Sequence, residues 1–219
     1  MNWLRRGTAV LFGLVAAAAV TVPVAVATPA PAPAPAGVSA LGCSTYYFDG
    51  DPRLGPEDLP LLGSVGLELL GYHRTGNEPV DEFLSAFYDS YAGSWIYPPD
   101  SGFVIGQDGN PVEVPQVLSA GQLIDRYGSG YGSFLAPAGE SYASRSIPPQ
   151  SLDGSPAADC DYHSYRVLRP FAVDAGPAAP WFAQPGGGVQ YELDAALLPE
   201  QPDTVNVLWL LDNGYLTEN

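Results

Sequence analysis

Arginine is the residue type whose positions say most about possible chemistry here, because positive charge is scarce. All eight basic residues of the 219-residue chain are arginines, they are set against 24 acidic residues, and the formal net charge is −16. Arg126 and Arg145 each stand beside a glycine- or serine-rich segment. Guanidinium groups make paired, charge-assisted hydrogen bonds to phosphate, so these two arginines could bind an anionic ligand against a repulsive overall field. Ion pairs with carboxylates such as Asp125 or Glu140 are the alternative, and the sequence leaves both open.

Three segments suit a binding site: Ile124–Leu135, Tyr142–Pro149 and Gly176–Gln190. The first leads from a strand-like stretch into a glycine-rich loop, and the third contains Gly186–Gly188 shortly before Gln190. Glycine lets the backbone approach a ligand closely, and loops of this kind often carry function. A glycine triplet by itself is also common in ordinary loops, so it gains weight only from its neighbours.

The common catalytic motifs are missing from the sequence. It contains no G-x-S-x-G, H-E-x-x-H, P-loop or paired-cysteine zinc pattern. A two-histidine metal site would need both His73 and His163, the only histidines, and a partly buried structural residue is the alternative for His163. The acidic residues permit a glycosidase-like carboxylate pair, but no spacing singles one out. The negative charge excludes binding of nucleic acid or anionic lipid through the overall field.

The N-terminal part predicts export. Residues 1–27 have the pattern of a secretory signal peptide, with two arginines, an apolar stretch and Ala25-Val26-Ala27 as the cleavage site; an uncleaved anchor helix is the alternative. Residues 28–41 begin with alternating Pro and Ala, which predicts an extended spacer. Cleavage leaves six arginines against 24 acids, a net charge of −18. No later apolar run approaches the roughly 18–20 residues of a membrane span, so we expect a secreted protein with no membrane segment after cleavage.

The chain has two cysteines, Cys43 and Cys160. In an exported protein they predict a single disulfide bond. Two free thiols are the alternative, which an oxidising compartment disfavours.

The elements that must position these residues fall into two parts. Residues 42–96 predict a small helical lobe, in which residues 79–91 have apolar side chains at helical spacing, behind Pro79 in the first turn. Residues 97–219 predict a β-rich body, because short strand-like runs alternate with turn residues. These runs are 112–117, 122–127, 133–135, 163–168, 171–173 and 189–193.

A final helix is predicted over residues 203–214, with Asp203 as its N-cap and Gly214 as its stop. The expected fold class is therefore α+β, with a mostly antiparallel sheet and a small helical N-terminal lobe.

Several short motifs occur in a distinctive order and spacing. They are Asp125-Arg-Tyr-Gly128, Tyr142-x-x-Arg145, Tyr162-His-x-Tyr165, Gly176-Pro-x-x-Pro-Trp-Phe182, Gln184-Pro-Gly-Gly-Gly-x-Gln190 and Gly214-Tyr-Leu216. Together they resemble the tuberculosis necrotizing toxin (TNT) family of NAD+ glycohydrolases over residues 97–219. The front part, with Tyr46-Tyr47 and Asp51-Pro-Arg-Leu-Gly55, looks more like the secreted fungal surface NADases of that family, which add an N-terminal thumb lobe.

The resemblance implies cleavage of NAD+, and also of NADP+, to nicotinamide and ADP-ribose. Carried over position by position, it implies catalytic roles for Gln190, Arg126, Arg145 and His163. It implies that the substrate is bound by Arg126, Tyr127, Phe134, Arg145, Trp181 and Gln190. In the toxin the aromatic at Phe134 is a Tyr, so no role for a hydroxyl is transferred. No cofactor is implied, because NAD+ is the substrate, and we transfer no metal site.

Two other functions remain alternatives. An ADP-ribosyltransferase toxin would use a glutamate near the ribose, and Glu192 lies two residues after Gln190 on the same strand face. A non-catalytic surface-binding module displayed on the spacer is the second alternative. Beyond NAD+ or NADP+ as substrate, the fungal resemblance suggests a homodimer through the front lobe, whereas an immunity partner cannot be inferred from the sequence.

Overall fold

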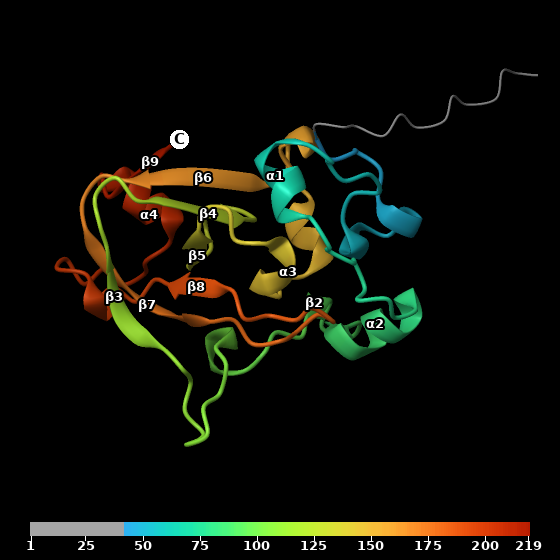
Figure 1. Cartoon of the computed structure of the whole chain (residues 1–219), viewed down its shortest axis with the longest axis horizontal. Helices are drawn as coiled ribbons and strands as arrows, with labels where there is room; N and C mark the ends of the chain where they lie inside the picture. The colour runs from blue at the N-terminus through green and yellow to red at the C-terminus, as the bar shows by residue number, and fades with distance from the viewer. Residues whose placement is uncertain (1–41) are drawn as a thin grey trace, which may run out of the picture. The chain divides into compact units, whose positions relative to one another are not determined.

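Seven short strands form one antiparallel sheet, which makes up the body of the protein in the computed structural model (Figure 1). In spatial order these strands are β3 (Val114–Leu118), β7 (Phe171–Pro177), β8 (Val189–Glu192), β5 (Phe134–Pro137), β4 (Leu123–Tyr127), β6 (Tyr162–Val167) and β9 (Leu216–Glu218). The structure describes residues 42–219, which belong to one compact unit. The predicted signal peptide and spacer lie outside the described residues.

Strand β7 buries every second side chain from Phe171 to Ala175, so that one of its faces packs on a large core. In β7, Phe171, Val173 and Ala175 are buried and join a cluster that includes Tyr191 of β8 and Leu210. The predicted run 171–173 is extended to Pro177 because Gly176 and Pro177 pair with Gln190 and Val189. The predicted α+β class is confirmed.

Two of the α-helices and a small hairpin lie in the N-terminal lobe (residues 42–96), to the right of the sheet in Figure 1. The lobe contains α1 (Gly63–Glu68), α2 (Val80–Phe87), β1 (Tyr88–Asp89) and β2 (Ser94–Trp95). The 3-10 turns are Phe48–Gly50, Pro52–Leu54, Asp100–Gly102, Pro149–Leu152, Ala157–Asp159 and Ala195–Leu197. The two other α-helices are α3 (Tyr142–Arg145) and α4 (Val207–Asp212).

The helix predicted over residues 79–91 is shorter than expected. Helix α2 begins at Val80 and buries Phe83, as the apolar spacing predicts, but it ends at Phe87. Tyr88 is already extended (φ −130°, ψ 121°), because it pairs with Trp95 in a two-stranded ladder.

The C-terminal helix also begins later than predicted. Its N-cap is Asn206, whose side chain accepts a hydrogen bond from the backbone N–H of Trp209, and not Asp203. Gly214 follows the helix in the left-handed region (φ +70°), as expected of a helix stop.

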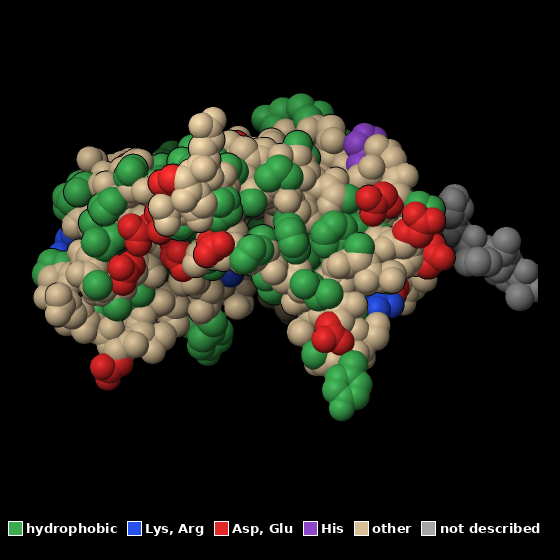
Figure 2. All heavy atoms as spheres, turned by 90° about the horizontal axis from the view of Figure 1, so that it is seen from below, with side chains coloured by type: hydrophobic (Ala, Val, Ile, Leu, Met, Phe, Trp, Pro, Cys, Tyr) green, Lys and Arg blue, Asp and Glu red, His purple; other side chains and the backbone are tan. Residues whose placement is uncertain are grey.

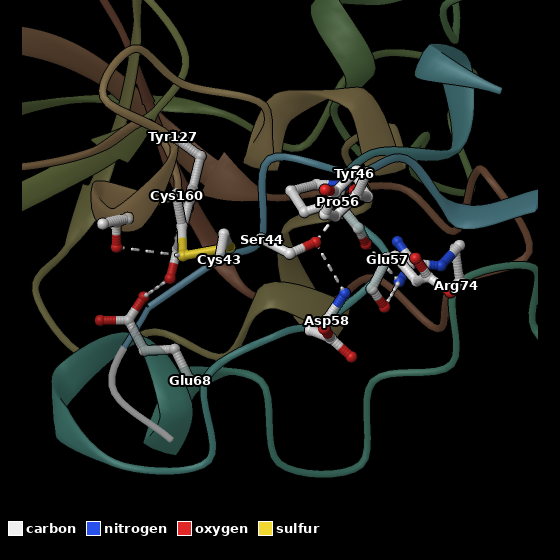
Figure 3. The surroundings of a disulfide bond; sticks show 11 residues. Cys43, Ser44, Tyr46, Pro56, Glu57, Asp58, Glu68, Arg74, Tyr127 and Cys160 are labelled. Atoms are coloured by element: carbon white, nitrogen blue, oxygen red, sulfur yellow. Dashed lines mark hydrogen bonds between the residues drawn. A yellow bond between two sulfur atoms is a disulfide. The ribbon is translucent and has the colours of Figure 1, made fainter. Parts of the chain in front are cut away.

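The predicted disulfide is confirmed between Cys43 and Cys160, whose Cα atoms lie 5.3 Å apart (Figure 3). It joins the N-terminal lobe to the segment before β6 and spans 117 positions of sequence. Both sulfur atoms belong to a buried cluster with Tyr127, Tyr142 and Leu152. The disulfide therefore helps to fix the lobe against the sheet.

Reduction of this disulfide is expected to lower the free energy of unfolding by up to about 4–5 kcal/mol, the chain-entropy value for so long a loop. Urea titrations with and without reductant, followed by tryptophan fluorescence, measure the change. The double variant Cys43→Ser/Cys160→Ser serves as the control and should not respond to reductant. A wild-type midpoint that reductant leaves unchanged would contradict the prediction.

Acidic side chains are spread over the face shown in Figure 2, with few basic ones among them. Among residues 42–219, no helix has the length and apolarity that crossing a membrane requires.

Candidate active site

A cavity of about 360 Å³ lies where the segment 97–102 faces strands β4, β5 and β8 and helix α3. Its wall contains five of the residues predicted to bind substrate: Arg126, Tyr127, Phe134, Arg145 and Gln190. The sheet order explains how they meet, because β5 pairs with β4 on one side and with β8 on the other. The structure therefore gathers at one place residues that are far apart in the sequence.

Arg126 projects from β4 and is held by backbone carbonyls. Its Nε donates to Gly128 O at 2.9 Å and its Nη1 to Phe134 O at 2.7 Å. Burial lowers the pKa of Arg126 below its ordinary value, and none of the ion pairs among residues 42–219 includes it. A Cβ at Gly132 would overlap its guanidinium group. The glycine-rich loop thus provides space for a cation that has no carboxylate partner in the described chain.

Arg145 stands in a different environment. Its Nη1 donates to Asp125 Oδ1 at 2.6 Å, its Nη2 to Glu68 Oε2 at 3.0 Å, and its Nε and Nη2 to Glu140 O. Burial by itself would lower the pKa of Arg145, but the hydrogen bond and charge of Asp125, with the charge of Glu68, raise it. Of the two alternatives that the sequence left open, ion pairing is the one observed for Arg145. Its guanidinium is largely neutralised before any ligand arrives.

The short helix α3 places Arg145 at the cavity wall. Ser141 caps this helix by accepting a hydrogen bond from the backbone N–H of Ser144. Ser146 follows in the left-handed region (φ +50°), which ends the helix directly after Arg145.

Gln190 lies on β8 and presents its amide group at the cavity wall. Its Nε2 donates to Ser101 O at 3.0 Å, and a carbonyl can only accept, so the orientation of the amide is settled. Gln190 Oε1 accepts no hydrogen bond from the described residues and remains available to a ligand.

The turn that carries Ser101 is an unusual backbone segment. Asp100, Ser101 and Gly102 all have positive φ values, of 51°, 53° and 77°. Non-glycine residues adopt this region rarely and at a cost, and such residues cluster at functional sites. The turn places Ser101 O against Gln190 and the Ser101 hydroxyl against Glu192 Oε1, at 2.8 Å. None of these three residues is among those that the sequence predicts for the site.

Aromatic side chains supply much of the rest of the wall. Phe134 is 37% exposed, and Tyr97 is 62% exposed and lies edge-on to Phe182. Tyr127 differs from both, because it is buried and its hydroxyl donates to Glu68 Oε2 at 3.0 Å. Tyr97 is not among the residues that the sequence predicts for the site. The only local signal is the pair Pro98-Pro99 directly after it, which predicts a turn.

Two predicted residues lie outside the cavity wall. Trp181 packs against Phe87 of α2, and its indole N–H donates to Ile96 O at 2.7 Å, so it joins the N-terminal lobe to the loop between β7 and β8. His163 pairs in register with Arg126 across β4 and β6. The Nε2 atom of His163 lies 3.1 Å from Asp161 Oδ1, and the His163 side chain does not line the cavity.

Glu192, the residue behind the transferase alternative, belongs to a separate depression next to the cavity. Six acidic residues line this depression, namely Asp100, Glu113, Asp174, Glu192, Asp194 and Asp203. Burial raises the pKa of Glu192, and the hydrogen bond from Ser101 opposes that rise. Within residues 42–219, no three acidic, histidine or cysteine side chains converge as metal ligands.

Comparisons with known proteins identify the family of the chain. Residues 117–219 match the family model described as Tuberculosis necrotizing toxin. The chain is 41% identical over 173 residues to the conidial surface nicotinamide adenine dinucleotide glycohydrolase of Aspergillus fumigatus. This alignment covers 78% of the chain and 70% of the fungal protein. Among solved structures, tuberculosis necrotizing toxin in complex with its immunity factor aligns with 64% of this chain and 71% of the toxin chain, at 21% identity and a TM-score of 0.47. The fungal relative and the family match show that the chain belongs to the tuberculosis necrotizing toxin family, as the sequence motifs predict.

Proposed function

We propose that the protein is an NAD+ glycohydrolase, which hydrolyses the N-glycosidic bond of NAD+ to give nicotinamide, ADP-ribose and a proton. The observation that carries the proposal is that Arg126 and Gln190 line the same cavity. Arg126 is a cation without a carboxylate partner among the described residues, and the amide of Gln190 is oriented by its hydrogen bond to Ser101 O. The fungal relative, itself a nicotinamide adenine dinucleotide glycohydrolase by name, supports the same substrate.

The chemistry needs few catalytic groups. Nicotinamide is attached as a pyridinium cation, so it leaves as a neutral base and requires no general acid, unlike the leaving group of an ordinary glycoside. Water then attacks the anomeric carbon of an oxocarbenium-like transition state and loses one proton. What the protein must supply is orientation of the two halves of NAD+ and preorganised polar groups near the ribose.

Gln190 is the residue we assign to the ribose. Its Nε2 is held by Ser101 O, and its Oε1 is the group that accepts a hydrogen bond from a ribose hydroxyl or from the attacking water. Preorganised polar groups of this kind contribute several kcal/mol to a transition state.

Arg126 is the residue we assign to the pyrophosphate, because its guanidinium has unpaired charge at the wall. Phe134 and Tyr97 offer exposed aromatic faces on which nicotinamide or adenine can stack. Arg145 lines the same wall and is placed to make a second contact with the pyrophosphate, whereas Tyr127 is buried and acts through its fixed position. The catalytic role predicted for His163 and the wall role predicted for Trp181 stay predictions, without support from their positions.

Product analysis tests the proposed function and separates it from its alternatives. The purified protein is incubated with NAD+, and nicotinamide, free ADP-ribose and protein-bound ADP-ribose are quantified. We expect nicotinamide and free ADP-ribose in equal amounts. Nicotinamide with ADP-ribose bound to protein would indicate a transferase, and binding of NAD+ without nicotinamide release would indicate a binding module.

Three finer properties belong to the same proposal. NADP+ is proposed as a second substrate, which the same assay measures. An extracellular or surface location is proposed from the name of the fungal relative.

A homodimer through the N-terminal lobe is proposed as well. Exposed Leu61, Leu67 and Leu70 on and beside α1 offer an apolar surface for it, and light scattering measures the mass.

A further inference from the structure

Glu68 is a buried carboxylate that connects the N-terminal lobe to the cavity. It is the last residue of α1, and its side chain is 3% exposed. Its Oε2 accepts hydrogen bonds from Tyr127 Oη and from Arg145 Nη2, each at 3.0 Å. Figure 3 shows Glu68 reaching from α1 toward Tyr127, beside the disulfide. Both of its partners line the cavity, whereas Glu68 does not.

The cluster around Arg145 contains more negative charge than positive. Glu68 and Asp125 hold the two Nη atoms of one guanidinium from different elements, and Asp125 is completely buried. Glu68 Oε1 is buried and has no hydrogen-bond partner among the described residues. Two ionised carboxylates on one guanidinium leave a surplus negative charge in a poorly solvated place, which is costly.

The surroundings of Glu68 favour its protonated form. Burial away from water, with the neighbouring charge of Asp125, raises the pKa of Glu68 to about 7, although Arg145 opposes the rise. The titratable groups that face it are Asp125 and Tyr127 of β4, Arg145 of α3 and Tyr162 of β6, with Tyr72 and Tyr142 in the same buried cluster. Asp125 is further engaged by Tyr162 Oη and Gly139 N, so Glu68 is the less supported carboxylate of the two.

We propose that Glu68 is a positioning residue of the NAD+ site, which sets the charge that Arg145 presents at the cavity wall and takes up a proton when a pyrophosphate binds there. This rests on the proposed function. An incoming anion adds negative charge beside a cluster that already has a surplus, so binding and protonation of Glu68 favour each other. Protonation removes one of the two charges that neutralise Arg145, and Arg145 becomes available to the anion.

The test uses ADP-ribose as the probe, because its binding does not depend on turnover and it does not itself titrate near neutrality. Calorimetry in buffers of different ionisation enthalpy measures proton uptake on binding. We expect uptake approaching one proton above pH 7 in the wild type, with a Kd that rises by up to about tenfold per pH unit there. Glu68→Gln keeps the size and an acceptor oxygen but not the charge. It should show no uptake, a Kd independent of pH, and tighter binding than the wild type on the alkaline side.

Glu82→Gln is the matched control, because it makes the same change at an exposed position of α2 and should behave as the wild type. ADP-ribose binding without proton uptake in the wild type would overturn the inference and leave the proposed function intact. Equal pH profiles for the wild type and Glu68→Gln would do the same. Failure of the wild type both to bind ADP-ribose and to release nicotinamide would overturn the proposed function and the inference together. If Glu68→Gln does not fold, the wild-type measurement still decides.

Discussion

Gln190→Ala is expected to lower kcat for nicotinamide release by at least about a hundredfold, the scale of losing one preorganised polar group, while the protein stays folded. The side chain is half-buried at the cavity wall and has one protein partner, Ser101 O. Its loss therefore opens no large cavity in the core and leaves no buried charge unpaired. Steady-state kinetics and a thermal unfolding curve measure the two effects separately.

Two further variants sharpen this result. Gln190→Glu keeps the shape but sets a carboxylate oxygen against the Ser101 carbonyl, where a donor is needed, so it should be nearly as inactive as Gln190→Ala. Gln107→Ala removes the same side chain from an exposed turn outside the cavity and should keep full activity. A well-folded Gln190→Ala protein with nearly normal kcat would refute the assignment.

Arg126→Ala is expected to lower kcat/KM for NAD+ by about ten- to a hundredfold, which corresponds to one hydrogen-bonded charge contact of 1.5–3 kcal/mol. Gly132→Ala should have a similar effect although the arginine itself is not substituted. The backbone of Gly132 is not in the left-handed region, but a Cβ there would overlap the guanidinium of Arg126. Because the end of a flexible side chain can move aside at small cost, stability should change little. Activity and urea midpoints of both variants test this.

Arg166→Ala provides the control for net charge. Arg166 is exposed on β6 and outside the cavity wall. Its replacement changes the net charge of the protein by the same amount as replacement of Arg126. We expect kcat/KM to remain close to that of the wild type. Equal losses in Arg166→Ala and Arg126→Ala would show that the effect is long-range and not due to a contact in the cavity.

The sequence predicts the positions of six strands of the seven-stranded sheet, because strand-like runs lie between turn residues there, and it misses β9 and the hairpin strands β1 and β2. It fails at element ends, where a partner distant along the chain or a competing cap decides. The apolar spacing of α2 continues to Tyr91, yet pairing of Tyr88 with Trp95 ends the helix. Asp203 and Asn206 are both good caps, and only the folded chain shows that Asn206 meets Trp209 N.

The sequence predicts the site residues that stand on a predicted strand next to a glycine-rich loop. Arg126 and Gln190 stand on strands beside glycine-rich loops, and both line the cavity. Glu68 could not be found in this way. It is one of 24 acidic residues, on a six-residue helix, and its partners lie 59 and 77 positions away. Its burial is a consequence of tertiary packing, which local pattern does not contain.

Release of nicotinamide from NAD+ by the purified wild type, measured beside Gln190→Ala, tests the central claim most directly. The account predicts steady release by the wild type and its near loss in the variant, with both proteins folded. A folded wild type that releases no nicotinamide would contradict the account.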